Sequence, residues 1–349
     1  MSEKKILTED AEIKNLLLSA DYIPFQKLKD KSVFITGGTG LVGSAFTKLL
    51  LAANTEFNLG TKIYLLVRNA AKAEGIFGKQ ANLYFVAGDL DNLPAIDFEI
   101  DYIMHSASPT ASQYFAEHPV ETVKTAVGGT IKLLDLAKEK AVKGFVYLSS
   151  MEVYGERQED EPISEKENLL VQPLRVRSCY PQSKLLCENL CVDYFEEYNL
   201  PCKIVRLAQT FGPGIPKDDN RVFAQFARSA IEKRDIILQT PGTTKQCYVY
   251  TLDASLAILA VLLGGEGGQA YNAANPDTYC SIREMAEMVA EKITGNSISV
   301  KVITSDDAAK KYPPAHKWNL SADKLFSLGW KPTANLTEMY VKLIDYLEN

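Results

Sequence analysis

The sequence predicts an α/β fold in which a doubly wound parallel sheet is joined to a smaller, irregular α/β C-terminal lobe. Five short apolar runs between residues 32 and 148 alternate with helical patterns. This alternation is typical of a parallel sheet that carries helices on both faces. Beyond Phe211 the pattern gives way to a loop rich in glycine, proline and charge, and no further βαβ repeat is obvious there.

The composition excludes several classes of protein. A net charge of −6 disfavours general binding to nucleic acid or to an anionic membrane. The six cysteines form no CxxC pair and the three histidines lack ligand spacing, so we expect no metal site. The charged N-terminus and the lack of an 18-residue apolar run predict a cytoplasmic protein without a signal peptide or membrane span.

We expect three regions along the 349 residues. Residues 1–30 form an N-terminal extension, which is helical around Ile13, Leu16 and Leu17 because these residues share one helical face. Residues 31–210 form a dinucleotide-binding domain. Residues 211–349 form mainly a substrate-binding lobe, with some segments that return to the first domain.

A glycine-rich turn joins the strand expected at 32–36 to a helical run. Gly37, Gly40 and Gly43 permit a tight turn, close approach of a pyrophosphate and close packing of helix on strand, while the helix N-terminus attracts the phosphates. We interpret the turn as a Rossmann-type dinucleotide site, and the alternative is an ordinary glycine-rich turn. The predicted cofactor contacts in it are Gly37, Thr39, Gly40, Leu41, Val42 and Gly43.

The end of the second strand leaves the choice of dinucleotide open. An acid is expected there if the ribose 2′-hydroxyl of NAD is bound, but the sequence has Arg68. An arginine can instead face the 2′-phosphate of NADP or stack on adenine, and it can equally be a solvated loop residue. The residues here therefore leave the choice between NAD and NADP open.

The third and fourth strands also end in residues suited to a cofactor. Asp89 and Leu90 follow the third strand, where a carboxylate can accept a hydrogen bond from the adenine amino group. Ala107 and Ser108 follow the fourth, and such small residues let the ribose and diphosphate lie against the chain. His105, inside the fourth strand, is interpreted as a core residue.

Ser150, Tyr180 and Lys184 have the side chains and spacing of a redox site. Ser150 leaves the end of the apolar strand expected at 145–148, and Tyr180 and Lys184 are four residues apart. On a helix they therefore share one face and can reach the same substrate atom. The pattern predicts a site where a substrate hydroxyl is oxidised.

Taken together, these motifs resemble the extended short-chain dehydrogenase/reductases, in particular the nucleotide-sugar epimerases, dehydratases and decarboxylases. The resemblance runs from about Lys31 to the C-terminus. It is nearest to UDP-glucuronate decarboxylase and dTDP-glucose 4,6-dehydratase, because Glu152 precedes VYG and RSCY precedes the lysine. The segments that carry it, in family order, are TGGTGLVGS, AGDL, HSASP, LSSMEVYG, CYPQSK, RLAQTFGP, YNAANP and LGWKP.

The resemblance implies roles for the residues of the redox site. Tyr180 would be the general base on the sugar C4 hydroxyl, Lys184 would favour its phenolate and hold the nicotinamide ribose, and Ser150 would orient the proton. Glu152 would act on the carbon beside the C4 ketone, or orient a carboxyl group that leaves. The dehydratases have an aspartate where this chain has Met151, which cannot donate a proton, so a standard 4,6-dehydratase is disfavoured.

Some substrate-contacting positions depart from the family. An arginine that meets phosphate or carboxylate in relatives is replaced by Gln246, with Lys245 beside it, and Gln209 stands for an asparagine. Arg177 and Arg221 are our preferred diphosphate ligands, with Arg206 and Arg228 as further candidates. The predicted substrate contacts are Ser150, Met151, Glu152, Arg177, Gln209, Thr210, Arg221 and Gln246.

The leading hypothesis is an enzyme that oxidises a nucleotide-linked sugar at C4 with bound NAD, after which the keto intermediate is epimerised, decarboxylated or dehydrated. A second hypothesis is an NADPH-dependent keto-sugar reductase, which Arg68 would suit. A third is a non-catalytic dinucleotide-sensing protein. The resemblance also implies a homodimer, formed through the helix of Tyr180 and the helix before it.

Overall fold

The computed structural model describes residues 9–108, 112–304 and 315–349. Its centre is a seven-stranded sheet in the order β10-β6-β5-β4-β1-β2-β3, in which every pairing is parallel. The predicted doubly wound α/β fold is confirmed. The strands are β1 (Ser32–Thr36), β2 (Lys62–Val67), β3 (Leu83–Ala87), β4 (Tyr102–His105), β5 (Gly144–Ser150), β6 (Cys202–Leu207) and β10 (Gln269–Ala273).

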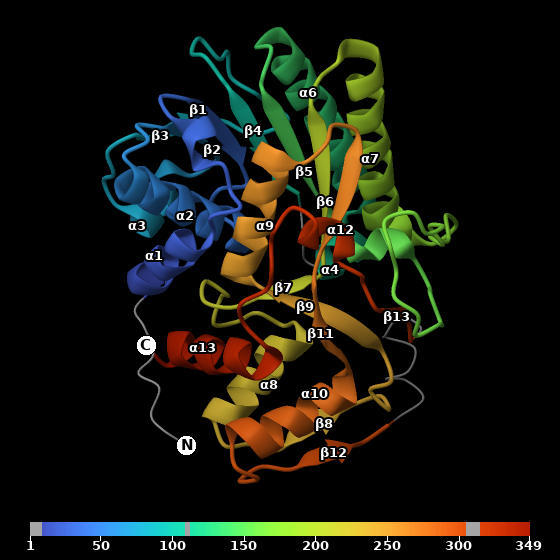
Figure 1. Cartoon of the computed structure of the whole chain (residues 1–349). Coiled ribbons are helices and arrows are strands. Elements are labelled where there is room, and N and C mark those ends of the chain that lie inside the picture. Colours follow the sequence, from blue (N-terminus) through green and yellow to red (C-terminus); the bar gives the residue numbers. More distant parts are fainter. Residues whose placement is uncertain (1–8, 109–111, 305–314) are drawn as a thin grey trace.

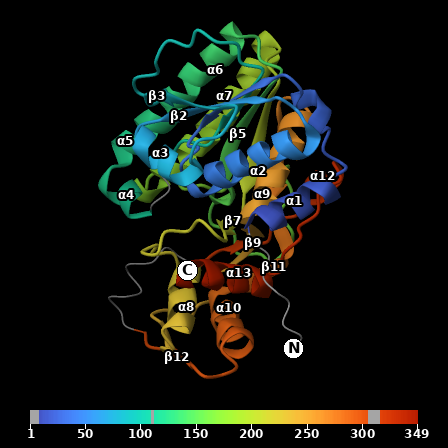
Figure 2. The same cartoon turned by 90° about the vertical axis from the view of Figure 1, so that its left-hand side faces the viewer.

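Helices cover both faces of this sheet (Figures 1 and 2). On one face, α2 (Leu41–Phe57) packs against α9 (Thr251–Gly264); on the other lie α6 (Gly129–Glu139) and α7 (Cys179–Tyr198). Because side chains alternate along a strand, Val33 and Ile35 of β1 enter the core on the α2 side and Phe34 enters the core on the α7 side. Helix α6 is preceded without a break by α5 (Pro119–Val123) and a π-helical turn (η2, Lys124–Gly128).

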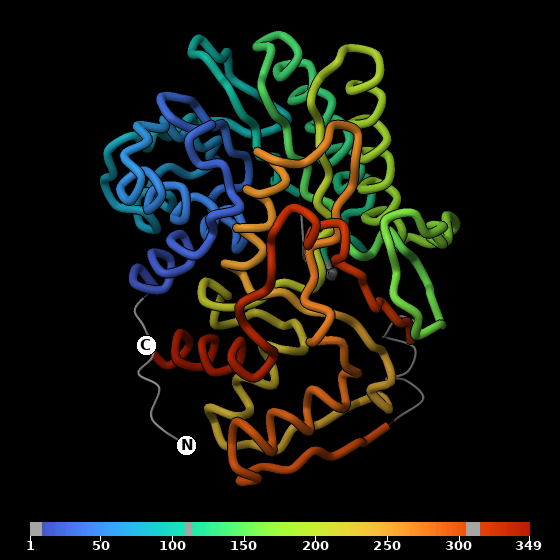
Figure 3. The backbone as a smooth tube through the Cα atoms, in the orientation of Figure 1, coloured from blue at the N-terminus to red at the C-terminus, as the bar shows by residue number. Residues whose placement is uncertain are grey.

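The chain returns to the sheet after residue 250. Helix α9 lies against β5 and β6, and β10 then pairs with β6 in parallel as the edge strand. The orange part of the tube in Figure 3 follows this return. No βαβ repeat is obvious in the sequence beyond Phe211, but α9 and β10 complete such a unit with β6. Helix α9 is difficult to recognise from the sequence because it is apolar on nearly every side and has no amphipathic period.

The C-terminal lobe contains two small sheets. In the larger one, β9 (Lys245–Tyr250) pairs with β7, β11 and β13, and in the smaller one β8 (Ile236–Leu238) pairs with β12 (Val300–Val302). The helix that begins at Ile282 follows a capping box of Ser281 and Glu284, and the residues before it form β11. The other bounds are β7 (Gln209–Phe211), β11 (Asn275–Ser281), β13 (Lys317–Trp318), α8 (Val222–Ile231), α10 (Ile282–Met288), η5 (Val289–Ile293), α12 (Asp323–Phe326) and α13 (Leu336–Glu348).

The N-terminal segment packs on the rest of the chain. Helix α1 (Glu9–Ser19) lies against α2 and buries Ile13, Leu16 and Leu17. Glu12 accepts hydrogen bonds from Lys342 of α13 (2.7 Å) and from the Tyr250 hydroxyl (3.1 Å). No helix in the described ranges is long and apolar enough to span a bilayer. The remaining helical segments are η1 (Phe25–Leu28), α3 (Ala70–Phe77), α4 (Ser112–Glu117), η3 (Met151–Tyr154) and η4 (Val176–Ser178).

Candidate active site

Most of the predicted cofactor and catalytic residues follow the carboxyl ends of sheet strands. The strands are parallel and in register, with Thr36 opposite His105 and His105 opposite Tyr147, so these ends meet along one edge. The strand order reverses between β1 and β4. In open α/β sheets, ligands bind beyond the carboxyl ends at such a switch point.

The glycine turn after β1 is packed so closely against its neighbours that a larger residue would clash at two of its positions. Gly37 has a φ of +72°, and a Cβ there would lie 2.6 Å from the Ser106 Oγ. A Cβ on Gly43 would lie 2.2 Å from the Gly37 carbonyl oxygen, so the helix can approach the strand only with glycine. Gly40 is the N-cap of α2 and has no side chain to satisfy the first N–H groups of the helix. The turn therefore fits the pyrophosphate of a dinucleotide.

The predicted adenine-side residues lie beyond β2 and β3. Arg68 is exposed at the end of β2. The Asp89 carboxylate accepts a hydrogen bond from the Asn92 backbone N–H (2.7 Å), which holds it beside the end of β3. Leu90 is buried, and a Cβ on Gly129 would lie 2.6 Å from its Cδ1, so the segment is packed tightly onto α6.

Most polar groups at the end of β4 bond to other parts of the protein, and one is left without a partner in the described part of the chain. The buried His105 ring bonds the Thr36 hydroxyl through Nδ1 (2.8 Å) and the Thr130 hydroxyl through Nε2 (3.1 Å), and burial lowers its pKa to about 3. It is therefore a neutral core histidine. The Ala107 N–H also reaches the Thr36 hydroxyl (3.3 Å). The Ser108 Oγ is buried and has no hydrogen-bond partner among the described residues, which leaves it for a ligand.

Ser150, Tyr180 and Lys184 come together at the start of α7. Tyr180 is 8 % exposed and Lys184 4 %, one helical turn apart. The Ser150 hydroxyl is close enough to the Tyr180 hydroxyl to lower the pKa of that phenol, and it accepts the Glu152 N–H (3.2 Å) at the start of η3. The Lys184 ammonium donates to the Leu148 carbonyl oxygen (2.7 Å) and lies 5.7 Å from the centroid of the Tyr180 ring.

Burial dominates the electrostatics of this group. It raises the pKa of Tyr180 well above the ordinary value, the charge of Glu152 acts in the same direction, and the Ser150 hydroxyl and Arg177 oppose it. Burial also lowers the pKa of Lys184 to about 8. The phenol is therefore neutral in the chain alone, because desolvation outweighs the cations near it.

Arg177 and Phe115 extend this group. The Arg177 Nη2 bonds both carboxylate oxygens of Glu152, at 3.0 and 2.9 Å, and the guanidinium lies 4.8 Å from the Phe115 ring centroid. Phe115, on α4, stacks on Tyr180 with ring centroids 4.4 Å apart. Phe115 could not be assigned to the site from the sequence, because one aromatic residue on a short helix has no pattern that indicates a functional role.

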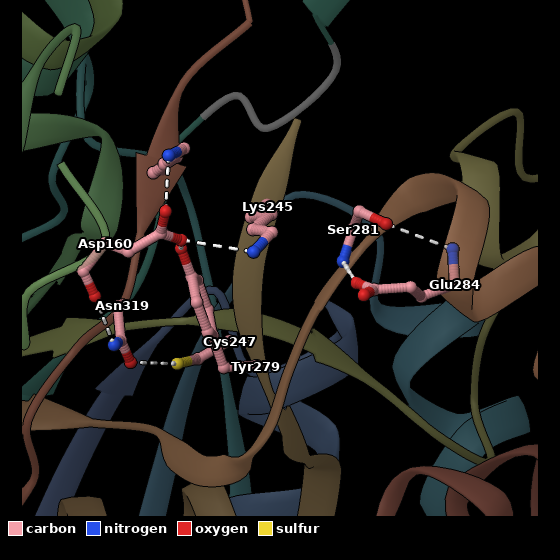
Figure 4. Close-up of polar contacts among 8 residues, drawn as sticks. Asp160, Lys245, Cys247, Tyr279, Ser281, Glu284 and Asn319 are labelled. Atoms are coloured by element: carbon pink, nitrogen blue, oxygen red, sulfur yellow. Dashed lines mark hydrogen bonds and ion pairs between the residues drawn. The ribbon is translucent and has the colours of Figure 1, made fainter. Parts of the chain in front are cut away.

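The remaining predicted substrate residues lie on separate elements. Met151 is buried at the start of η3. Gln209 and Thr210 are on β7, which pairs with β9, the strand that carries Gln246. Lys245, beside Gln246, is already engaged: Figure 4 shows it bonded to Asp160, at 3.2 Å. Asp160 also accepts from Lys317 and from the Tyr279 hydroxyl.

Like Arg177, two further candidate diphosphate arginines are held by carboxylates. Arg221 bonds Asp219 at the start of α8, with Nε 3.0 Å from Oδ1, and remains partly exposed. Arg206 is buried and bonds Glu188 through Nη2 at 2.7 Å, so its candidacy as a diphosphate ligand is wrong. Both partners line a separate hollow of about 780 Å³ between α7, the β6–β10 edge and α12.

Comparisons with known proteins agree with this geometry. The NAD dependent epimerase/dehydratase family matches residues 33–274. UDP-glucuronic acid decarboxylases 2 and 3 of Arabidopsis thaliana are 31 % and 33 % identical, over 89 % and 88 % of this chain and 67 % and 86 % of theirs. The crystal structure of DesIV, a dTDP-glucose 4,6-dehydratase from Streptomyces venezuelae, has a TM-score of 0.76 at 22 % identity and covers 91 % of this chain and 97 % of its own.

Proposed function

Because the chain belongs to the NAD-dependent epimerase/dehydratase family, we propose that it oxidises a nucleotide-linked sugar at C4 and then alters the resulting ketone without net oxidation. The predicted class, an NAD-dependent enzyme that modifies nucleotide sugars, is the class of its relatives. The observation that supports the C4 step is the convergence of Ser150, Tyr180 and Lys184 at the carboxyl edge of the sheet, the edge at which the glycine turn also lies. A purely dinucleotide-sensing protein would not need these three side chains together.

The cofactor of this proposal is NAD, which supplies the acceptor for the hydrogen at C4. The N-terminus of α2 and the glycines before it would hold the diphosphate, Asp89 and Leu90 the adenine, and the orphaned Ser108 hydroxyl the ribose side. Lys184, buried one turn after Tyr180, would donate to the nicotinamide ribose. The exposed position of Arg68 leaves it free to stack on the adenine without a 2′-phosphate.

Tyr180 takes the proton of the C4 hydroxyl in this proposal. The nearby Ser150 hydroxyl gives that proton a defined path, because one hydroxyl can donate while the other accepts. Burial raises the pKa of Tyr180, so the phenolate forms only when positive charge is added nearby. The oxidised nicotinamide of a bound NAD would supply such a charge beside Tyr180.

The second step that we propose is loss of a carboxyl group from the 4-keto sugar. Relatives of 31 % and 33 % identity are UDP-glucuronic acid decarboxylases. Met151 is a buried thioether and cannot protonate a departing hydroxyl, which argues against dehydration. A 4-keto group stabilises the carbanion left at C5 when carbon dioxide departs, so the step needs no acid at the position of Met151.

We also propose that the protein is a cytoplasmic homodimer. Large apolar side chains are exposed on the outer surfaces of α5, α6 and α7: Val120, Val123, Ile131 and Leu186. These helices form one layer, since α5 and α6 both contact α7, and a second copy of this layer would cover the apolar side chains. All six cysteines are unpaired thiols, as is usual in a reducing compartment.

The experiment is to incubate the NAD-loaded protein with a panel of nucleotide sugars and to follow product mass. We expect UDP-glucuronate to lose the mass of carbon dioxide with no net change in NAD. Unchanged mass with altered chromatographic retention would replace decarboxylation by epimerisation. Conversion of none of the sugars, or stoichiometric consumption of NADPH, would contradict the proposed function.

A further inference from the structure

Arg177 occupies the boundary between the redox group and the residues of the second step. It lies on η4, directly before α7, and its guanidinium is 5.8 Å from the centroid of the Tyr180 ring. One edge of the guanidinium is occupied, because Nη2 bonds both oxygens of Glu152. The guanidinium also lies over the Phe115 ring, 4.8 Å from the ring centroid. These contacts fix the plane of the guanidinium and the direction of its remaining donors.

The other edge of Arg177 lacks a partner. Its Nη1 is buried and has no hydrogen bond among the described residues. A guanidinium carries five N–H donors, and a buried donor without an acceptor is unfavourable. The free edge, which is Nη1, therefore fits an acceptor that arrives with the substrate, and an anionic oxygen makes the stronger, charge-assisted bond to it.

Two other cations near the predicted substrate contacts, Lys245 and Arg221, are held by carboxylates. Lys245 is held by Asp160 in the cluster of Figure 4, and Arg221 bonds Asp219 with three donor–acceptor contacts. Gln246 is neutral. Arg177 differs from these residues because a buried part of its guanidinium is still unsatisfied.

We propose that the free edge of Arg177 binds the carboxylate of a sugar acid, so that the substrate is a nucleotide-linked uronic acid. The inference rests on the proposed C4 oxidation at Tyr180. C4 lies next to C5, which bears the carboxylate of a uronic acid, whereas the diphosphate is attached to C1 across the ring. A cation this close to the Tyr180 ring is therefore nearer to the C5 substituent than to the diphosphate. Arg177, expected from the sequence to bind the diphosphate, is thus proposed to bind the sugar carboxylate instead.

The proposal also explains the contact between Arg177 and Glu152. A substrate carboxylate placed directly beside Glu152 would be repelled by it. With Arg177 between them, each carboxylate takes one edge of the same guanidinium. Glu152 would then orient the arginine toward the sugar, and Arg177 would act as a residue that selects the substrate.

The test compares the binding of UDP-glucuronate, UDP-glucose and UDP by calorimetry. It uses NAD-loaded protein in a Tyr180→Phe background, which prevents turnover during the titration. Arg177→Met should weaken UDP-glucuronate binding by about 10- to 100-fold and leave UDP-glucose and UDP within about threefold, because a charge-assisted bond to the sugar acid is removed. Arg177→Lys should fall between the two, since it restores charge without the fork.

Arg175→Met is the matched control. Arg175 is two residues earlier, half-exposed and paired with Glu156, so its replacement changes net charge equally and should leave all three affinities unchanged. Equal losses for UDP-glucuronate, UDP-glucose and UDP after Arg177→Met would overturn the inference in favour of a diphosphate contact. Wild-type enzyme that oxidises UDP-glucose but not UDP-glucuronate would overturn it too, while the proposed C4 oxidation would stand.

Discussion

The two ends of the candidate site are built differently. At the redox end, Tyr180 and Lys184 are almost fully buried, and Lys184 is held by a main-chain carbonyl. At the other end, Glu152 and Arg177 keep 24 % and 36 % of their side-chain surface exposed and hold each other as an ion pair. The first end is therefore positioned by backbone and burial. The second depends on charges that a bound substrate can rearrange.

The largest expected effect is at the buried end. Tyr180→Phe removes the group that takes the C4 proton, and kcat should fall by about 10²- to 10⁴-fold while NAD binding persists. Tyr198→Phe, on the exposed last turn of the same helix, is the matched control and should retain full activity. Steady-state kinetics and the NAD content of the purified variants measure both. A fully active Tyr180→Phe enzyme would show that the buried end does not perform the redox step.

A smaller effect is expected from the link between the two ends. Glu152 raises the pKa of Tyr180, so Glu152→Gln should lower that pKa. C4 oxidation needs the phenolate and rises as pH passes through this pKa, so the acid limb of its pH profile should move to lower pH. Single-turnover formation of reduced nicotinamide measures this limb. Glu156 pairs with Arg175 instead, so the control variant Glu156→Gln should leave the acid limb in place. An acid limb that stays in place in Glu152→Gln would show that the charge of Glu152 does not influence Tyr180.

The smallest effect is expected outside both ends, in the Asp160 cluster of Figure 4. Asp160→Asn weakens the contacts with Lys245, Lys317 and Tyr279, all of them near the surface. Exposed ion pairs contribute little and are screened by salt. Calorimetry should show a small fall in Tm at low salt that disappears at high salt, with turnover unchanged. Lost turnover would mean that this cluster positions the substrate surface.

The same difference explains what could be predicted from the sequence. The strand at 32–36 has the predicted bounds, and Tyr180 and Lys184 share a helical face as their spacing predicts. These features depend on local patterns of period 2 or 3.6 and on glycine chemistry. The strand-end residues could be placed on one edge because parallel topology brings those ends together.

What could not be predicted depends on contacts between distant segments. The pairing of Arg206 with Glu188, the stacking of Phe115 on Tyr180 and the pairing of Arg177 with Glu152 each join elements that no local pattern relates. Helix α9 and strand β10 could not be recognised for another reason. A helix buried on nearly all sides has no amphipathic period, so the sequence did not show that a helix precedes β10 and leads the chain back to the sheet.

The most direct test of the account is single-turnover formation of reduced nicotinamide from UDP-glucuronate carrying hydrogen or deuterium at C4. The NAD-loaded enzyme is mixed with each substrate in turn, and the absorbance of reduced nicotinamide is followed. We expect a transient signal that forms several-fold more slowly with the deuterated sugar, because the bond to hydrogen at C4 breaks in that step. A product that forms without reduced nicotinamide, or at the same rate from both sugars, would contradict C4 oxidation at Ser150, Tyr180 and Lys184.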